Sequence, residues 1–191
     1  MPAPLWRERV TRGYGRSPRR GWGIRDGDRR AAPARLLAVR EHLLQRSQRV
    51  PVPPERAFEF YADALNLEPM TPPWLHFEVT TQGPITMGAG TLLDYKLRLH
   101  GIPVRWQTKI ETWEPPHRFT DTQLRGPYSI WEHTHTFEDD GEGGCEMSDE
   151  VRYAIPYGPL GDLAHRLFVR RDLERIFDFR RDAFAAHFAN V

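Results

Sequence analysis

The feature that most constrains this fold is a change in hydrophobic period near residue 158. From residue 91 to 153, apolar and polar residues alternate in short segments, as in strands with one buried face. From Leu160 to Phe188, apolar residues recur at helical spacing without an internal proline. A helix of that length is about 40 Å long. It can bury such a stripe only against a sheet, so we expect it to lie across the concave face of the sheet.

The segments before residue 158 predict an antiparallel sheet with two short helices near its start. Asp139-Asp140-Gly141 is a strong hairpin signal between two alternating segments. Helical spacing after Pro54 predicts one helix, and a second helical turn is expected over residues 65–70. The expected strands are residues 40–52, 74–81, 91–99, 104–113, 119–125, 129–137 and 145–153. The fold class is therefore α+β, with a seven-stranded antiparallel sheet wrapped around a long C-terminal helix and two short helices after the first strand.

Charge divides the chain into two parts. Residues 1–35 hold ten arginines against three acidic residues, whereas the whole chain has a formal net charge of only +1. Because this segment has few apolar residues, we expect an arginine/glycine-rich disordered tail over residues 1–35 and one folded domain over residues 36–191. Arginines can contact phosphates, so binding of RNA or of a protein partner through the tail stays open as an alternative. Charge alone is a weak indication, and we do not expect nucleic-acid binding.

The cysteine count and the lengths of the apolar runs indicate the cellular compartment in which the protein is expected. Cys145 is the only cysteine, so the chain cannot form an internal disulfide, which is typical of a reducing compartment. The longest apolar runs are far shorter than the roughly 20 residues that a membrane-spanning helix needs. We therefore expect a cytoplasmic protein without a membrane span, and the sequence does not determine its oligomeric state.

Five polar residues share strand faces with apolar residues in the second half of the sheet. If Phe119, Trp131 and Met147 face inward, the alternation brings these polar side chains inward with them. Burying such a group without a partner costs on the order of 1 to 3 kcal/mol, so they should hydrogen-bond to one another, to water or to a ligand. The set comprises Asp121, Gln123, His133, His135 and Asp149.

Three interpretations of this polar set stay open. In the first, Asp121 and Asp149 orient the two histidines in a buried network that only stabilises the strand register. In the second, the polar groups face a cavity and bind the polar end of an apolar ligand. In the third, the His-x-His pair and the carboxylates form a metal site, or an acid/base set near neutral pH. Because the motif is unspecific, we expect neither a resident metal nor a cofactor.

The order of the elements and several short motifs resemble the START-like superfamily, also called SRPBCC or polyketide cyclase/dehydrase-like. The motifs are similar to those of a bacterial subgroup and lie at residues 67–75 (LEPMTPPWL), 119–121 (FTD), 126–128 (GPY), 131–137 (WEHTHTF), 149–153 (DEVRY) and 156–161 (PYGPLG). The resemblance covers about residues 40–188. It implies a helix-grip fold with a deep apolar cavity between the sheet and the terminal helix.

The resemblance leaves the function open, because this superfamily includes carriers, cyclases and oxygenase subunits. We predict binding of a hydrophobic or aromatic small molecule, such as a lipid, a quinone or a polyketide-like compound, and favour a protein without catalytic activity. The main alternative is an enzyme of the cyclase/aromatase or dehydratase type. In that enzyme His133 or His135 would transfer protons, and Asp121 and Asp149 would be further catalytic candidates.

The same alternation predicts which residues line the cavity. The expected apolar lining is Leu93, Tyr95, Leu97, Trp106, Phe119, Trp131, Met147, Val151 and Tyr153, with Leu163, Leu167 and Phe168 of the helix as a lid. The polar end of the ligand site should consist of Asp121, Gln123, His133, His135 and Asp149. A slip of one residue in any strand would turn its share of this lining outward.

Overall fold

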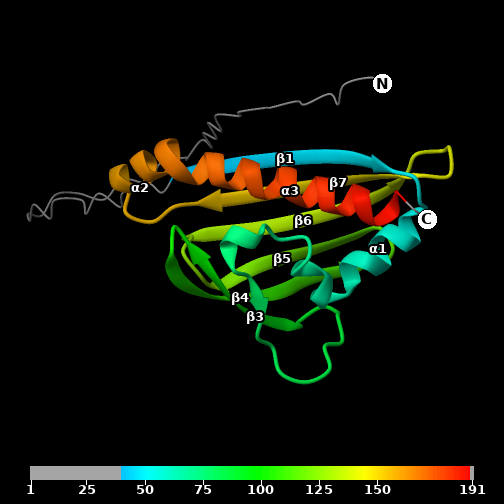
Figure 1. Ribbon diagram of the computed structural model, residues 1–191, viewed down its shortest axis with the longest axis horizontal. Coiled ribbons are helices and arrows are strands. Elements are labelled where there is room, and N and C mark those ends of the chain that lie inside the picture. Colours follow the sequence, from blue (N-terminus) through cyan, green and yellow to red (C-terminus); the bar gives the residue numbers. More distant parts are fainter. Residues whose placement is uncertain (1–39, 190–191) are drawn as a thin grey trace, which may run out of the picture.

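The computed structural model describes residues 40–189 and shows one antiparallel sheet against a long C-terminal helix (Figure 1). The strands are β1 (Glu41–Val50), β2 (Glu78–Val79), β3 (Leu92–Leu99), β4 (Ile102–Glu114), β5 (Arg118–Arg125), β6 (Ile130–Asp139) and β7 (Cys145–Ala154). Their order in the sheet is β1-β7-β6-β5-β4-β3-β2, so that the first strand pairs with the last. The predicted helix-grip fold is confirmed, whereas the predicted tail over residues 1–35 lies outside the described residues.

The helices form two groups. After β1 come α1 (Pro54–Ala62) and two 3-10 turns, η1 (Ala64–Leu67) and η2 (Pro73–Leu75). At the other end of the chain, α2 (Pro159–Ala164), the π-helical turn η3 (His165–Val169) and α3 (Arg170–Phe188) follow one another directly. Among residues 40–189, no helix is both long and apolar enough to cross a membrane.

The apolar face of α3 attaches the C-terminal helix to the sheet. Leu173 and Phe177 are buried and pack in one cluster with Val151 and Tyr153 of β7. Nearer the C-terminus, Phe184 is fully buried among aromatic side chains of α1 and the sheet. Side chains of β7 and α3 therefore fill the interior on the β7 side of the sheet.

The predicted strand over residues 74–81 is wrong over most of its length. Only Glu78 and Val79 pair with β3. Pro72 and Pro73 precede them and start the turn η2, because proline cannot donate a hydrogen bond to a sheet. His76 then adopts a left-handed backbone conformation with a φ of 44°. The segment consequently leaves the sheet and forms a loop over its concave side.

The predicted apolar stripe of the terminal helix is wrong in its first half. Leu163, Leu167 and Phe168 are 53%, 56% and 53% exposed. One turn before the buried Leu173 lies Val169, so Leu163 and Leu167 project from a different face of the helix. Figure 1 also shows that α2 extends past the ends of β6 and β7, whereas α3 lies over the sheet. The predicted lid therefore does not cover the sheet.

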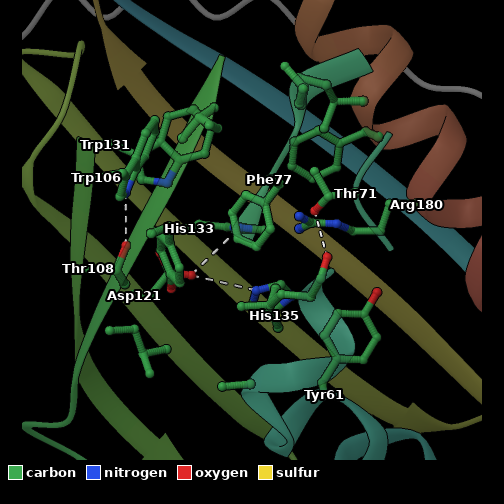
Figure 2. Close-up of a pocket in the computed structure, with 18 of the residues that line it drawn as sticks. Tyr61, Thr71, Phe77, Trp106, Thr108, Asp121, Trp131, His133, His135 and Arg180 are labelled. Atoms are coloured by element: carbon green, nitrogen blue, oxygen red, sulfur yellow. Dashed lines mark hydrogen bonds and ion pairs between the residues drawn. The ribbon is translucent and has the colours of Figure 1, made fainter. Parts of the chain in front are cut away.

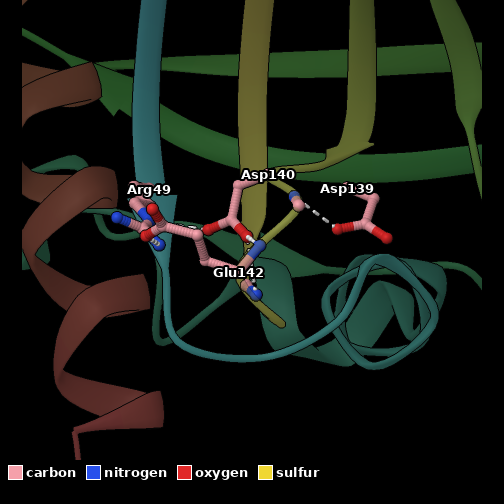
Figure 3. A network of polar contacts seen from close by, with 6 residues as sticks. Arg49, Asp139, Asp140 and Glu142 are labelled. Atoms are coloured by element: carbon pink, nitrogen blue, oxygen red, sulfur yellow. Dashed lines mark hydrogen bonds and ion pairs between the residues drawn. The ribbon is translucent and has the colours of Figure 1, made fainter.

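The predicted hairpin between β6 and β7 is confirmed and is fixed by side chains (Figure 3). Asp139 accepts a hydrogen bond from the backbone N–H of Gly141, which has a φ of 75° that favours glycine. Asp140 accepts hydrogen bonds from the backbone N–H groups of Glu142 and Gly144. Arg49 of β1 forms ion pairs with Asp140 and Glu142, which join the hairpin to the neighbouring strand.

Substitution of Phe184 by alanine tests whether α3 packing stabilises the fold. We expect Phe184→Ala to lower the free energy of unfolding by about 3 to 5 kcal/mol, because it leaves a large cavity in a fully buried aromatic cluster. Urea denaturation followed by circular dichroism measures the change. The matched control is Phe168→Ala in the exposed part of the helix, for which a change within about 0.5 kcal/mol is expected. Equal losses in the two variants would contradict this packing.

Candidate functional site

A cavity of about 150 Å³ lies between the sheet and the helices, on the side of β3 to β6. Its walls are mostly apolar and aromatic, and Figure 2 shows the residues that surround it. The indole N–H of Trp106 donates to the hydroxyl of Thr108 at 2.9 Å, so this polar group of the wall is already satisfied. The predicted residues that do line the cavity are Leu93, Tyr95, Leu97, Trp106, Phe119, Asp121, Trp131, His133 and His135.

Other predicted lining residues lie elsewhere. Met147 belongs to the core cluster under α1 and the end of α3, and Val151 and Tyr153 are covered by α3. Gln123 donates to the backbone carbonyl of Tyr128 and accepts from its N–H, which fixes the loop after β5. The prediction fails for the three β7 residues because the helices pack directly on β7 and leave no space there, and it fails for Gln123 because its side chain binds the loop backbone.

The helix side of the cavity also differs from the prediction. Leu163, Leu167 and Phe168 are exposed and do not line it. Leu173, Ile176, Phe177 and Arg180 of α3 line it instead, together with Tyr61 of α1 and the loop residues Thr71, Leu75 and Phe77. The sequence contains a signal for one of these residues. Arg180 follows Phe177 by three positions, so the two side chains lie on the same face of α3, which is the buried face.

The strand register brings two histidines and two aspartates together at one end of the cavity. Asp121 of β5 lies opposite His133 of β6, and His135 of β6 lies opposite Asp149 of β7. The side chains of His133 and His135 are only 4% and 5% exposed, and the two rings are 3.9 Å apart. The alternation of β5, β6 and β7 therefore brings together four of the five polar residues predicted to face inward, without Gln123. We call Asp121, His133, His135 and Asp149 the His–Asp cluster.

Each imidazole of the cluster lies between two carboxylates. The Nε2 atom of His133 is hydrogen-bonded to Asp149 Oδ1 at 2.9 Å. The Nδ1 atom of His135 is 2.8 Å from the same oxygen, but the contact is poorly aligned for a hydrogen bond. The remaining nitrogens, His133 Nδ1 and His135 Nε2, are each 3.7 Å from Asp121 Oδ2. Asp149 thus lies behind the histidines, and Asp121 lies on the cavity side.

Burial and neighbouring charges shift the pKa values of the two histidines in opposite directions. Burial lowers the pKa of His133, and the neighbouring His135 lowers it further. Burial also acts against the charged form of His135, but the contacts with Asp121 and Asp149 outweigh it and raise its pKa. Burial opposes the charge of Asp149, yet the contacts with the two histidines hold its pKa well below the usual value. A proton in the cluster therefore favours His135 over His133, and Asp149 favours its ionised form.

Two polar side chains reach the cavity from the helix side. The hydroxyl of Tyr61 is buried and has no hydrogen-bond partner among residues 40–189. Burial raises its pKa well above the usual value, so the hydroxyl keeps its proton and can donate. The Tyr61 ring lies 5.2 Å from that of His135. Arg180 extends from α3 into the same space (Figure 2), and its buried Nε atom also lacks a partner within the described residues.

Three side chains of the cluster have the donor types of a metal site. One ligand atom from each of Asp121, His133 and His135 lies within 4.8 Å of the others. The arrangement can therefore hold and transfer a proton, bind a polar group of a ligand, or hold a cation.

A seven-stranded antiparallel sheet that encloses an apolar cavity with a C-terminal helix defines the helix-grip class of proteins. Comparison with protein families gives the more specific assignment, since residues 41–189 match the model of the family described as polyketide cyclase/dehydrase and lipid transport. The chain belongs to this family. Its fold is of the kind that binds hydrophobic ligands.

Solved structures of similar shape share little sequence with this chain. The protein TTHA0849 from Thermus thermophilus has a TM-score of 0.63 at 21% identity, covering 78% of this chain and 98% of that chain. The ZhuI aromatase/cyclase from Streptomyces sp. R1128 has a TM-score of 0.62 at 15% identity, covering 78% and 94%. Norcoclaurine synthase from Thalictrum flavum, in complex with dopamine and hydroxybenzaldehyde, has a TM-score of 0.59 at 15% identity, covering 81% and 90%. No significant match is found among curated proteins.

Histidine titration tests the protonation of the cluster. We expect the two buried histidines to titrate on opposite sides of the usual value of 6.5, His133 below it and His135 above it. Asp149→Asn should lower the pKa of His135, because it removes a negative charge beside the imidazolium. NMR of the imidazole nitrogens, recorded after treatment with a chelator, measures both values. Asp94→Asn, on the opposite face of β3, is the control and should change neither. A lower pKa for His135 than for His133 in the wild type would contradict the assignment.

Proposed function

We propose that the protein binds a small aromatic molecule in the cavity, with a polar substituent directed at the His–Asp cluster. The observation that carries this proposal is a pair of buried donors without a partner among residues 40–189, Tyr61 Oη and Arg180 Nε, in side chains that line a mostly apolar cavity. A buried donor without a partner costs about 1 to 3 kcal/mol, and an oxygen of a ligand would remove that cost. The cavity thus has a hydrophobic wall and a polar end, as ligand sites usually do.

The size and the walls of the cavity favour one aromatic ring over a lipid. A cavity of about 150 Å³ is large enough for a molecule of the size of benzene. The aromatic wall includes Trp106 and Trp131, whose rings are 5.2 Å apart in an edge-to-face arrangement, and Phe77 beside Tyr95. Such walls favour planar ligands, because aromatic rings gain energy in stacked and edge-to-face contacts. A longer lipid or a fused polycyclic compound would have to extend beyond this volume.

Binding of p-cresol and toluene tests the ligand class. We expect the wild-type protein to bind p-cresol more tightly than toluene, because the hydroxyl can reach the polar end of the cavity. Tyr61→Phe should reduce this preference by about 3- to 10-fold, the value of one lost hydrogen bond. Leu93→Trp should abolish binding of both compounds by filling the cavity. Isothermal titration calorimetry measures all affinities.

The control for the blocking variant is Leu124→Trp, on an exposed position of β5 that does not line the cavity. It should bind both compounds as the wild type does. Binding that survives Leu93→Trp would place the ligand elsewhere and contradict the proposal.

A second candidate function is proton-transfer catalysis, as in a cyclase/aromatase or a dehydratase. The observation that favours it is the separation of protonation within the cluster: the pKa of His135 is raised and that of His133 is lowered, and both residues line the cavity. A protonated and an unprotonated imidazole in one site can act as general acid and general base. Tyr61 and Arg180 would stabilise negative charge on an enolate oxygen of the substrate.

Hydrogen exchange of acetophenone tests this second function. Acetophenone has one ring and exchanges its α-hydrogens for deuterium in D₂O when a base removes a proton and an acid returns a deuteron. If the protein is such an enzyme, the wild type should accelerate exchange and His133→Gln should abolish the acceleration, as followed by proton NMR. His117→Gln, a histidine outside the cavity, is the control and should exchange like the wild type. Wild-type exchange at the rate of buffer alone would leave ligand binding as the only proposed function.

A further inference from the structure

The His–Asp cluster has the inner and outer parts of a metal site. Histidines that bind metals commonly donate their second ring N–H to a carboxylate, which sets the tautomer and the orientation of the ring. Asp149 lies in that position for His133, because its Oδ1 atom is hydrogen-bonded to His133 Nε2 at 2.9 Å. The same oxygen is 2.8 Å from His135 Nδ1, where a small rotation of the imidazole would align the two atoms for a hydrogen bond. Protons on these two nitrogens leave the lone pairs of His133 Nδ1 and His135 Nε2 on the side of Asp121.

The distances from Asp121 to the two histidines suit a transition-metal ion, and the three ligand atoms all lie within 4.8 Å of one another. Asp121 Oδ2 is 3.7 Å from both free nitrogens. Two ligand atoms at that separation subtend an angle of about 120° at a metal bonded to each at about 2.1 Å. An ideal tetrahedral site needs about 3.4 Å between ligands, so shifts of a few tenths of an ångström are enough for those two pairs. Both histidines lie on one strand, and Asp121 is directly across from His133, so the backbone already holds the three ligands together.

We propose that Asp121, His133 and His135 bind one divalent transition-metal ion, with Asp149 as the carboxylate that orients both histidines. Two histidines and one carboxylate on one side of an ion are a ligand set that Zn²⁺ and Fe²⁺ accept, with open positions for water or substrate. Here those positions face the cavity, because all three ligands line it. The site does not depend on the aromatic ligand proposed above.

Charge balance gives an independent argument. Asp121 and Asp149 are only 16% and 13% exposed as side chains, so two carboxylates are largely removed from water. Buried charges need partners of opposite sign. One divalent cation would balance both carboxylates and allow both histidines to be neutral ligands.

Titration of the full-length, chelator-treated protein with Zn²⁺ tests the site. We expect one ion per chain by isothermal titration calorimetry, and a loss of affinity of at least about 100-fold in Asp121→Asn and in His135→Gln. Asp149→Asn should retain the stoichiometry and bind about 10- to 100-fold more weakly, as expected for a carboxylate that orients metal ligands. An anaerobic titration with Fe²⁺ distinguishes which of the two ions binds more tightly.

The control addresses another histidine pair that could bind Zn²⁺ nonspecifically. His42 and His165 are stacked with ring centroids 3.5 Å apart, outside the cavity. His165→Gln should leave Zn²⁺ binding unchanged. If His165→Gln removes binding while Asp121→Asn retains it, the ion is at the other pair and the proposal is wrong.

A measurement on the wild type alone covers the case in which variants fail to fold. Co²⁺ replaces Zn²⁺ in sites of this type and reports its ligands by visible absorption. We expect ligand-field bands at one equivalent of Co²⁺, together with loss or shift of the His133 and His135 imidazole signals in NMR. A wild-type protein that shows neither change, or that binds no Zn²⁺, would overturn the proposal.

Discussion

The packing of the apolar face of α3 against the sheet determines where this protein has room for a ligand. Leu173 and Phe177 press on β7, and Phe184 fills the space between α1 and the sheet. Side chains therefore fill the interior on the β7 side and at the C-terminal end of α3, and leave no space for a ligand there. The remaining volume lies over β3 to β6, where side chains of the strands face a loop as well as a helix. The cavity is thus a consequence of asymmetric coverage of one curved sheet.

The chemistry at the end of the cavity depends on strand register. Asp121 and His133 are direct neighbours across β5 and β6, and His135 and Asp149 are direct neighbours across β6 and β7. Because side chains alternate between the two faces of a sheet, a slip of one residue in β6 would turn both histidines away from both aspartates. The strand register thus brings the polar side chains of the cluster together. The contacts between these side chains in turn stabilise that register.

The sheet, the order of the elements and the strand half of the cavity could be predicted from the sequence, because a period of two residues also specifies which side chains share a face. The helix half was predicted poorly. Leu163 and Leu167 look like part of one stripe with Phe177, but a continuous helix can change the face that it buries. Periodicity over a long segment does not show where this happens. Tyr61 falls in the helix predicted after Pro54, and helical spacing alone does not indicate that its side chain lines a cavity. Phe77 falls in a predicted strand but lies in a loop. The neighbouring prolines determine its backbone position, and the apolar pattern around Phe77 does not.

The two halves of the cavity are held by different kinds of structure. His133 and His135 lie on β6, which is hydrogen-bonded to a strand on each side. Tyr61, Phe77 and Arg180 come from two helices and a loop, whose positions depend mainly on side-chain packing. Substitutions among the helix and loop residues can thus reshape the space available to a ligand while the strand residues of the cavity stay in register. Divergence within such a fold would then proceed through changes in the helix and loop residues of the cavity. Proteins that share the strand residues could bind ligands of different shape.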